Sequence, residues 1–148
     1  MPTADASPLT LKVQRLHPSA TLPRHSRPGD AGIDLYASES FDLGPGERHV
    51  FGTGIAIAVP DGYVGLVWDR SGLAARAGLT TLGGVIDTTY RGEVRVTILN
   101  THTEPYRIMA GDRIAQLLVQ AVPAVTVEEV PALDTTERGE AGFGSSGR

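Results

Sequence analysis

Two aspartates in this sequence stand where a carboxylate could do chemistry on a phosphorylated ligand. Asp34, in the stretch DAGIDLYA, alternates with the apolar Ile33 and Leu35, so its carboxylate faces away from them and could orient the waters around a Mg²⁺ ion. Asp87, in GGVIDTTYRGEV, lies on a turn from which it could take a proton from an attacking water, and Tyr90 could lay its ring against a sugar or a flat ligand. A solvent-facing strand residue and ordinary turn chemistry are the alternatives for these residues.

Two further stretches offer groups that bind phosphate. In DRSGLA, Ser71 and Gly72 open the one helical segment that the sequence predicts, and their unpaired N–H groups beside Arg70 form an anion site. In GDRIAQL, Arg113 and Gln116 flank an apolar residue and could reach a phosphate. An ordinary helix cap in the first stretch and a pair of polar edge-strand residues in the second are the alternatives.

The C-terminal stretch RGEAGFGSSGR, which begins at Arg138, has little with which to pack itself. Its glycines, among them Gly144, would let the backbone close over a ligand, while Ser145 and Ser146 could donate hydrogen bonds to phosphate oxygens. Phe143 could stack on a base. The alternative is a mobile tail with no ligand.

Taken together, these groups predict a nucleoside triphosphate hydrolase without a P-loop. The inventory holds three arginines for phosphates, one aspartate for a metal, a second for water, and two aromatic rings for a base and its sugar. The sequence has no G-x-x-x-x-G-K-[ST] loop, no H-E-x-x-H and no G-x-S-x-G elbow. Its four histidines are scattered, which disfavours a histidine-built zinc site.

Composition favours many short strands joined by tight turns. The chain of 148 residues is long enough for one domain, and it holds 18 glycines and 10 prolines but only 5% aromatic residues. The lack of cysteine excludes disulfides and thiolate metal sites and fits a cytoplasmic protein. A formal net charge of −4 with no basic stripe disfavours a nucleic-acid partner, and no apolar run approaches the ~20 residues that cross a membrane.

The expected elements are strands and one short helix, and the expected fold is an all-β, jelly-roll-like β-sandwich or barrel. Period-two alternation and turn signals place the turn of a hairpin at residues 60–62 and the tip of another within residues 83–94. We expect a flexible N-terminus over 1–10, a β domain over 11–130 and a mobile C-terminal arm over 131–148. The predicted helix covers 71–77, and the predicted strands cover residues 11–16, 33–37, 47–59, 63–68, 93–100, 106–109, 113–122 and 125–130.

The order of the chemical stretches resembles that of the five motifs of the trimeric dUTPases, the deoxyuridine triphosphate nucleotidohydrolases. These stretches are DAGIDLYA, DRSGLA, GGVIDTTYRGEV, GDRIAQLLV and RGEAGFGSSG, and the resemblance runs from about residue 11 to the C-terminus. It implies a jelly-roll homotrimer that hydrolyses dUTP to dUMP and pyrophosphate with Mg²⁺, which keeps uracil out of DNA and supplies dUMP for thymidylate synthesis. In this family, the tail of one subunit closes over a site shared by the other two.

The resemblance also implies a role for each candidate residue. Asp87 would orient and deprotonate the water that attacks the α-phosphorus in line, Tyr90 would pack under the deoxyribose, and Asp34 would hold Mg²⁺ through water. Main-chain groups at Gly84 and Val85 would read the uracil edge. The remaining residues would bind the phosphates and the base, with Phe143 on the uracil ring: Arg70, Ser71, Gly72, Gln116, Arg138, Phe143, Gly144, Ser145 and Ser146.

The chain departs from the family pattern at three places. Asp69 stands where proline is common and adds a negative charge next to the phosphate site, so we expect its side chain to point away. Gly83 and Gly84 form a short turn where many members insert an asparagine-bearing loop, so base recognition would depend on main-chain groups. Ala141 replaces a common tail glycine, which would stiffen the closure.

Three other functions compete with dUTP hydrolysis. A dCTP deaminase-like enzyme would share the fold and the triphosphate site, but that family uses a pocket glutamate and lacks the glycine-rich tail. A nucleotide-binding or signalling protein with the dUTPase fold would not need turnover, whereas this sequence keeps Asp87, Arg70 and Ser71. A general β-sandwich interaction module would not explain the tail.

Overall fold

Strands dominate the computed structural model, which describes residues 8–145 and 147. Two turns that contain glycine and proline, at residues 44–47 and 60–63, lie at the two ends of the longest strand, because such residues end the ladders. The described residues form ten strands and one helix: β1 Lys12–Arg15, β2 Ile33–Tyr36, β3 Phe41–Leu43, β4 Arg48–Ala58, β5 Tyr63–Trp68, α1 Ser71–Ala77, β6 Leu79–Leu82, β7 Val85–Ile86, β8 Glu93–Asn100, β9 Tyr106–Ile108 and β10 Arg113–Ala121.

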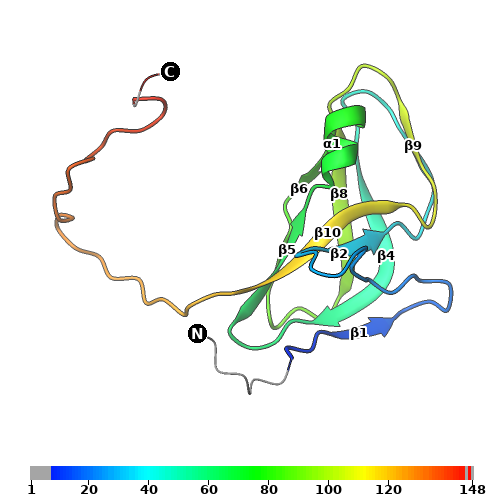
Figure 1. Cartoon of the computed structure of the whole chain (residues 1–148), viewed down its shortest axis with the longest axis horizontal. Helices are drawn as coiled ribbons and strands as arrows, with labels where there is room; N and C mark the ends of the chain where they lie inside the picture. The colour runs from blue at the N-terminus through cyan, green and yellow to red at the C-terminus, as the bar shows by residue number, and fades with distance from the viewer. Residues whose placement is uncertain (1–7, 146, 148) are drawn as a thin grey trace.

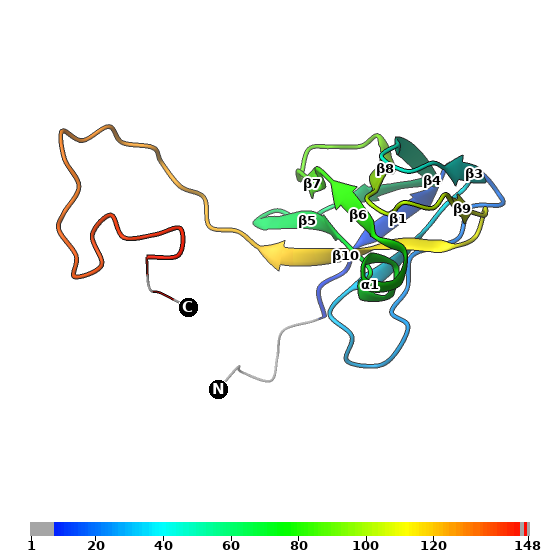
Figure 2. The same ribbon diagram turned by 90° about the horizontal axis from the view of Figure 1, so that it is seen from above.

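Two four-stranded antiparallel sheets make up the body of the molecule. Their strand orders are β1-β4-β8-β6 and β2-β10-β5-β7, and β3 and β9 form a separate two-stranded ladder. Figures 1 and 2 show the strands gathered in one body, with the helix α1 at one end of it. The expected all-β sandwich with one short helix is therefore confirmed.

The core lies between the sheets because alternate residues of their strands are apolar. In β8, Val94, Val96 and Ile98 are buried, while the residues between them are polar or half-buried. Leu35 of β2 and Leu117 of β10 belong to the same buried cluster from the other sheet. Residues of one strand that share a face point in one direction, so the period of two along β8 places three side chains in the core.

The predicted elements agree with the structure where the pattern is long. The helix at residues 71–77 and the strands at 63–68 and 93–100 are confirmed to the residue. The short strands β3, β6 and β7 were not predicted, since two to four residues carry too little alternation. The strand predicted at 125–130 is wrong, because residues 122–145 contain no strand and none of the described strands pairs with them.

Two stretches predicted as hairpins connect the sheets instead. The turn at residues 60–62, closed by a 3.1 Å hydrogen bond from the Tyr63 N–H to the Pro60 carbonyl, joins β4 to β5, and these strands lie in different sheets. In residues 83–94, β7 pairs with β5, whereas β8 pairs with β6. Both hairpin predictions are therefore wrong, because alternation shows where a strand lies but not its partner.

The chain beyond β10 extends away from the sandwich (Figures 1 and 2). No hydrogen bond or ion pair joins residues 123–145 to the sandwich. Residues 1–7 of the expected flexible N-terminus lie outside the described residues. Within the part of the chain that the structure describes, no helix has the length and apolar character that a membrane crossing requires.

Asn100 joins β8 to the end of β3 and to the loop that follows β8 through its buried side chain, which is 0% exposed. Its Nδ2 donates to the carbonyl oxygens of Leu43 at 3.0 Å and Glu104 at 2.9 Å, and its Oδ1 accepts from the His102 N–H at 2.9 Å. Each of these three backbone groups would lose a partner if the amide were removed. The side chain therefore stabilises the fold through several hydrogen bonds at once.

We predict that Asn100→Leu lowers the free energy of unfolding by about 2–4 kcal/mol, because it leaves buried polar groups unpaired. Urea unfolding followed by circular dichroism measures the change. Gln14→Leu is a matched control, since Gln14 is exposed on the edge strand β1. A loss no larger in Asn100→Leu than in the control would contradict the prediction.

Candidate active site

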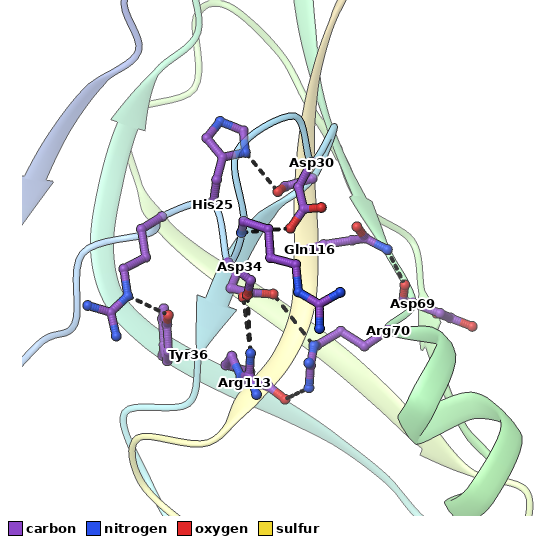
Figure 3. Close-up of polar contacts among 12 residues, drawn as sticks. His25, Asp30, Asp34, Tyr36, Asp69, Arg70, Arg113 and Gln116 are labelled. Atoms are coloured by element: carbon purple, nitrogen blue, oxygen red, sulfur yellow. Dashed lines mark hydrogen bonds and ion pairs between the residues drawn. The ribbon is translucent and has the colours of Figure 1, made fainter.

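The Asp34 carboxylate lies between two arginines. Its oxygens are 3.5 Å from Arg70 Nε and 3.7 Å from Arg113 Nη1, and the Ser26 hydroxyl donates a hydrogen bond to it. Figure 3 shows this arrangement, with Asp34 on β2 and the two arginines reaching it from other elements. The residue is only 8% exposed, so the alternative of a solvent-facing strand residue is wrong. A charge this buried is held by its ionic partners.

Arg70 reaches this cluster because it stands between β5 and α1. It is the cap residue of α1, with φ −88° and ψ 122°, and no side chain caps the helix, so an ordinary cap by Asp69 or Ser71 is wrong. One Nη of Arg70 donates to the Arg113 carbonyl at 3.2 Å. The arginine is therefore fixed against the first residue of β10 and faces Asp34.

A cavity of about 500 Å³ opens beside this ionic cluster. Its lining includes three arginines and two aspartates, so the site holds a net positive charge and suits an anion such as a phosphate group. It brings together six of the predicted residues, namely Asp34, Arg70, Ser71, Gly72, Arg113 and Gln116. The sequence prediction missed five other lining residues: Ser26, Arg27, Asp30, Ala31 and Gly32.

Most of the missed residues belong to the loop that precedes β2. The Asp30 carboxylate accepts a hydrogen bond from the Arg27 N–H at 2.9 Å, which closes a turn. The turn signal of Pro28 and Gly29 placed a loop here, but nothing in the local pattern showed that the loop would fold over β2. The bridge between Arg24 and Asp34 holds the loop there.

Gln116 lies across Gly32 and contacts the end of β5. Its Nε2 donates to the Asp69 carbonyl at 2.7 Å, and it stands in register with Asp34 on β2 and with Trp68 on β5. A Cβ at position 32 would collide with the Gln116 carboxamide. A side chain at position 32 would therefore displace the Gln116 carboxamide from its bond to Asp69, and glycine lets Gln116 stay between the two strands that carry the cavity.

The Asp69 side chain points away from the arginine-lined cavity, as expected (Figure 3). It contacts β6 instead. Its carboxylate accepts hydrogen bonds from the Thr80 hydroxyl at 2.8 Å and from the Thr81 hydroxyl and N–H, both at 2.6 Å. Burial raises the pKa of the Asp69 carboxyl, but the bonds from Thr81 and Thr80 outweigh it and hold that pKa below its ordinary value of 3.8.

A second cavity, of about 330 Å³, lies beside the turn between β6 and β7. Gly83 and Gly84 have φ of 74° and 111°, a conformation that side chains rarely adopt. The Gly84 carbonyl accepts a hydrogen bond from the Val67 N–H at 2.8 Å, so the turn lies directly against β5. The predicted residues Gly84 and Val85 line this cavity together with Leu66, Val67, Trp68, Asp69, Thr80, Thr81 and Gly83.

Asp87 and Tyr90 line neither cavity of their own chain. A hydrogen bond of 3.2 Å from the Tyr90 N–H to the Asp87 carbonyl closes a tight turn, and the Tyr90 hydroxyl donates to the Glu93 carbonyl at 2.9 Å. Both residues are exposed. The single chain therefore separates the predicted base and the predicted sugar-packing ring from the arginines.

The predicted residues of the tail are also apart from both cavities. Arg138 Nε donates to the Ala141 carbonyl at 2.8 Å, and Phe143 is exposed with a φ of 51°. Gly144 and Ser145 are exposed in the same segment, while Ser146 lies outside the described residues. Within the single chain, no described group of the sandwich forms a hydrogen bond with residues 138–145.

The residues around Asp34 suit a metal ion that binds together with a phosphorylated ligand. Among the described residues, no three His, Cys, Asp or Glu side chains come together in a way that could hold a metal ion. Asp34 supplies one carboxylate beside two guanidinium groups. Mg²⁺ keeps several waters and is commonly bound by one or two carboxylates plus substrate phosphates, so Asp34 fits a hydrated ion carried by a phosphorylated ligand.

The fold and the cavities define an antiparallel β-sandwich protein with an arginine-lined anion site. The family model described as dUTPase matches residues 18–147, which is most of the chain. The chain belongs to the dUTPase family.

Relatives of known name and structure agree with this family. The chain is 50% identical over 141 residues to the deoxyuridine 5'-triphosphate nucleotidohydrolase of Corynebacterium glutamicum, covering 93% of this chain and 95% of the relative. For the enzyme of the same name from Thermobifida fusca, the identity is 48% over 151 residues, covering 97% and 84%.

Solved structures share the fold. A point mutant of the Staphylococcus bacteriophage 80alpha dUTPase with dUpNHpp matches with a TM-score of 0.88 and 32% identity over 94% of this chain and 99% of the other. A mutant dUTPase from phage phi11 of S. aureus, described with a structural Mg(II) ion, matches with a TM-score of 0.80 and 27% identity over 86% and 100%.

The lowered pKa of Asp69 predicts how stability depends on pH. The folded state holds this proton less tightly than the unfolded chain, so Asp69 contributes stability that is fully present above about pH 3.8 and is lost as the pH falls through the lower pKa of the folded state. We predict that Asp69→Asn lowers the free energy of unfolding at neutral pH by about 1–3 kcal/mol, because one acceptor oxygen and the charge are lost.

The measurement is urea unfolding of both proteins at neutral pH and at several pH values below about 5, the range in which Asp69 titrates. The difference between wild type and variant shrinks as the pH falls. Asp42→Asn serves as the control, since the exposed Asp42 side chain of β3 is paired with Arg107 of β9 at 2.8 Å. A difference that is constant across the whole pH range would show the prediction to be wrong.

Proposed function

We propose that this protein hydrolyses dUTP to dUMP and pyrophosphate. The observation that carries the proposal is the cavity in which Arg70, Arg113 and Asp34 meet, in a chain that belongs to the dUTPase family over most of its length. Named relatives at about 50% identity and neighbours solved with dUpNHpp support the same substrate. By this route, the protein keeps uracil out of DNA and supplies dUMP.

The arginine-lined cavity takes the triphosphate. Arg70 and the N–H groups of Ser71 and Gly72 contact the phosphate oxygens, because the start of α1 has no side-chain cap to compete for them. Gln116 adds a donor, and Arg113 adds a second positive charge. A dense array of donors of this kind stabilises the charge that develops on a phosphoryl group during displacement.

The second cavity takes the uracil base. Main-chain groups at Gly84 and Val85 read the edge of the ring, since the short turn carries no side-chain amide. Tyr90 packs against the deoxyribose, where a 2′-hydroxyl would not fit. Asp87 acts as the general base, orienting and deprotonating the water that attacks the α-phosphorus in line with the departing pyrophosphate.

A complete site requires several copies of the chain. Asp87 and Tyr90 line neither cavity of their own chain, and residues 123–145 make no hydrogen bond to their own sandwich. We therefore propose a homotrimer in which each site combines groups from neighbouring subunits. Residues 131–148 form an arm that closes the site, with Phe143 stacked on uracil and with Arg138, Gly144, Ser145 and Ser146 around the terminal phosphate.

Mg²⁺ is the proposed cofactor, bound with the triphosphate. Asp34 would hold it through water, and when bound the ion neutralises charge on the phosphate oxygens. The structural Mg(II) of the phi11 enzyme supports the metal's identity. We further propose a cytoplasmic location and no nucleic-acid or membrane partner, in keeping with the absence of cysteine and the net charge of −4.

A nucleotide panel tests the proposed reaction. We predict that the wild-type protein with Mg²⁺ releases pyrophosphate from dUTP far faster than from dCTP, dTTP or UTP and produces no ammonia. Asp87→Asn is expected to bind dUMP normally but to turn over at least ~10²-fold more slowly, because the general base is lost. Pyrophosphate and ammonia are measured separately, since ammonia from dCTP would instead indicate a deaminase. Turnover by Asp87→Asn within a few-fold of wild type would remove the assigned role.

Deletion of residues 138–148 tests the arm. We predict that the shortened protein keeps its oligomeric state and its melting temperature, because the described part of this segment forms no hydrogen bond with its own sandwich. The shortened protein should be nearly inactive on dUTP, since the closing residues are gone. Light scattering, thermal melts and steady-state kinetics measure the three quantities, and normal kcat in the deleted protein would contradict the proposal.

A further inference from the structure

The Asp69 carboxylate connects the two sheets at the edge strand β6. In its own sheet, β6 pairs only with β8, so the backbone groups on its other side have no strand partner among the described residues. Asp69 follows β5 of the opposite sheet. Its carboxylate accepts a hydrogen bond of 2.6 Å from one of these backbone groups, the Thr81 N–H. The carboxylate also accepts hydrogen bonds from the hydroxyls of Thr80 and Thr81. Three hydrogen bonds to one carboxylate thus fix β6 to the end of β5.

The main chain of Asp69 is held independently of its side chain. The Asp69 carbonyl accepts a 2.7 Å hydrogen bond from Gln116 of β10. Its neighbour Arg70 is fixed by its contacts with Arg113 and Asp34. Changing the Asp69 side chain therefore removes the connection to β6 but leaves the bonds that place Arg70 in the phosphate cavity.

The turn that follows β6 has little rigidity of its own. It contains Gly83 and Gly84, and glycine restricts the backbone less than any other residue. On one side the turn is anchored by the pairing of β6 with β8 and by the bond from the Thr81 N–H to Asp69. On the other side it is anchored by the bond from the Val67 N–H to Gly84 and by the pairing of β7 with β5. Asp69 thus provides one of the anchors for the turn that lines the second cavity.

We propose that Asp69 is a positioning residue for base recognition: by fixing β6 against β5, it sets the main-chain groups of the turn at Gly84 and Val85 at the distance that a uracil ring requires. The inference rests on the proposed function, because it assigns the second cavity to the base. Asp69 itself contacts no reacting atom. Its effect is confined to binding of the base, since contacts that do not involve the Asp69 side chain hold Arg70 in the phosphate cavity and hold the main chain of Asp69 in place.

The experiment separates the two halves of the substrate. Binding of dUMP and of inorganic triphosphate with Mg²⁺ is measured by calorimetry for wild type, Asp69→Asn and the double variant Thr80→Val/Thr81→Val. We expect the Kd for dUMP to rise about tenfold in both variants, which corresponds to about 1.4 kcal/mol. The Kd for triphosphate should stay within about twofold. In steady-state kinetics, KM for dUTP should rise with kcat nearly unchanged.

Controls distinguish positioning from a general loss of stability. Asp42→Asn changes an aspartate of β3 that is ion-paired with Arg107 and does not line the second cavity, so it should change neither Kd. All measurements are made well below the melting temperature of each variant. The double threonine variant keeps the Asp69 charge, so agreement between the two variants assigns the effect to the hydrogen bonds themselves.

Each outcome bears on a separate claim. Equal weakening of dUMP and triphosphate binding, or unchanged dUMP binding in both variants, would overturn the positioning role while wild-type hydrolysis of dUTP still upheld the proposed function. Failure of the wild type to hydrolyse dUTP would overturn the proposed function. Failure of the wild type to bind dUMP would overturn the positioning role, which assigns the second cavity to the base.

Discussion

The contact of Asp34 with Arg70 and Arg113 is the interaction on which the rest of the site depends. A nearly buried carboxylate is costly unless opposite charges lie close to it, and the two arginines supply them. They come from the junction of β5 with α1 and from the start of β10, so the contact forms only when β2, β10 and β5 are neighbours. With two positive groups facing one negative group, the cluster keeps positive charge for an anionic ligand.

Strand register places the two cavities on either side of one residue. Gln116 of β10 is in register with Asp34 of the arginine-lined cavity and with Trp68 of the second cavity. In the function that we propose, the sandwich holds the phosphate-binding groups in rigid positions, while the glycine turn after β6 supplies main-chain groups for a flat ring. This division agrees with the general arrangement in which loops held by a rigid scaffold carry recognition.

Much of the fold was predictable because long strands alternate. The pattern of Val94, Val96 and Ile98 identified β8 to the residue, and glycines near both ends of α1 confined it to 71–77. Partners were not predictable: the apolar Val85 and Ile86 follow β6 but pair with β5, because packing between sheets, not local sequence, decides the pairing. The strand predicted at 125–130 was wrong for the same reason: the local pattern does not show whether a partner strand exists, and none of the described strands pairs with these residues.

The candidate site was predictable in its residues and less so in its geometry. The motif order identified Asp34, Arg70 and Gln116, which the structure places around one cavity. The burial of Asp34 and the hydrogen bond that it accepts from Ser26 could not be predicted from the sequence, since both depend on a loop that folds back over β2. The anchoring of β6 by Asp69 was also not predictable from the sequence. Asp69 is 11 and 12 positions before Thr80 and Thr81, and it meets them only because the end of β5 packs against the edge of the other sheet.

Trp68 gives the second cavity an optical property of its own. It is the single tryptophan of the sequence, it is 56% exposed, and it lines that cavity beside Val85. Indole emission shifts in wavelength and intensity when water around the ring is replaced by an aromatic neighbour. Intrinsic fluorescence of the unlabelled protein thus reports occupancy of this one pocket, with no background from other indoles.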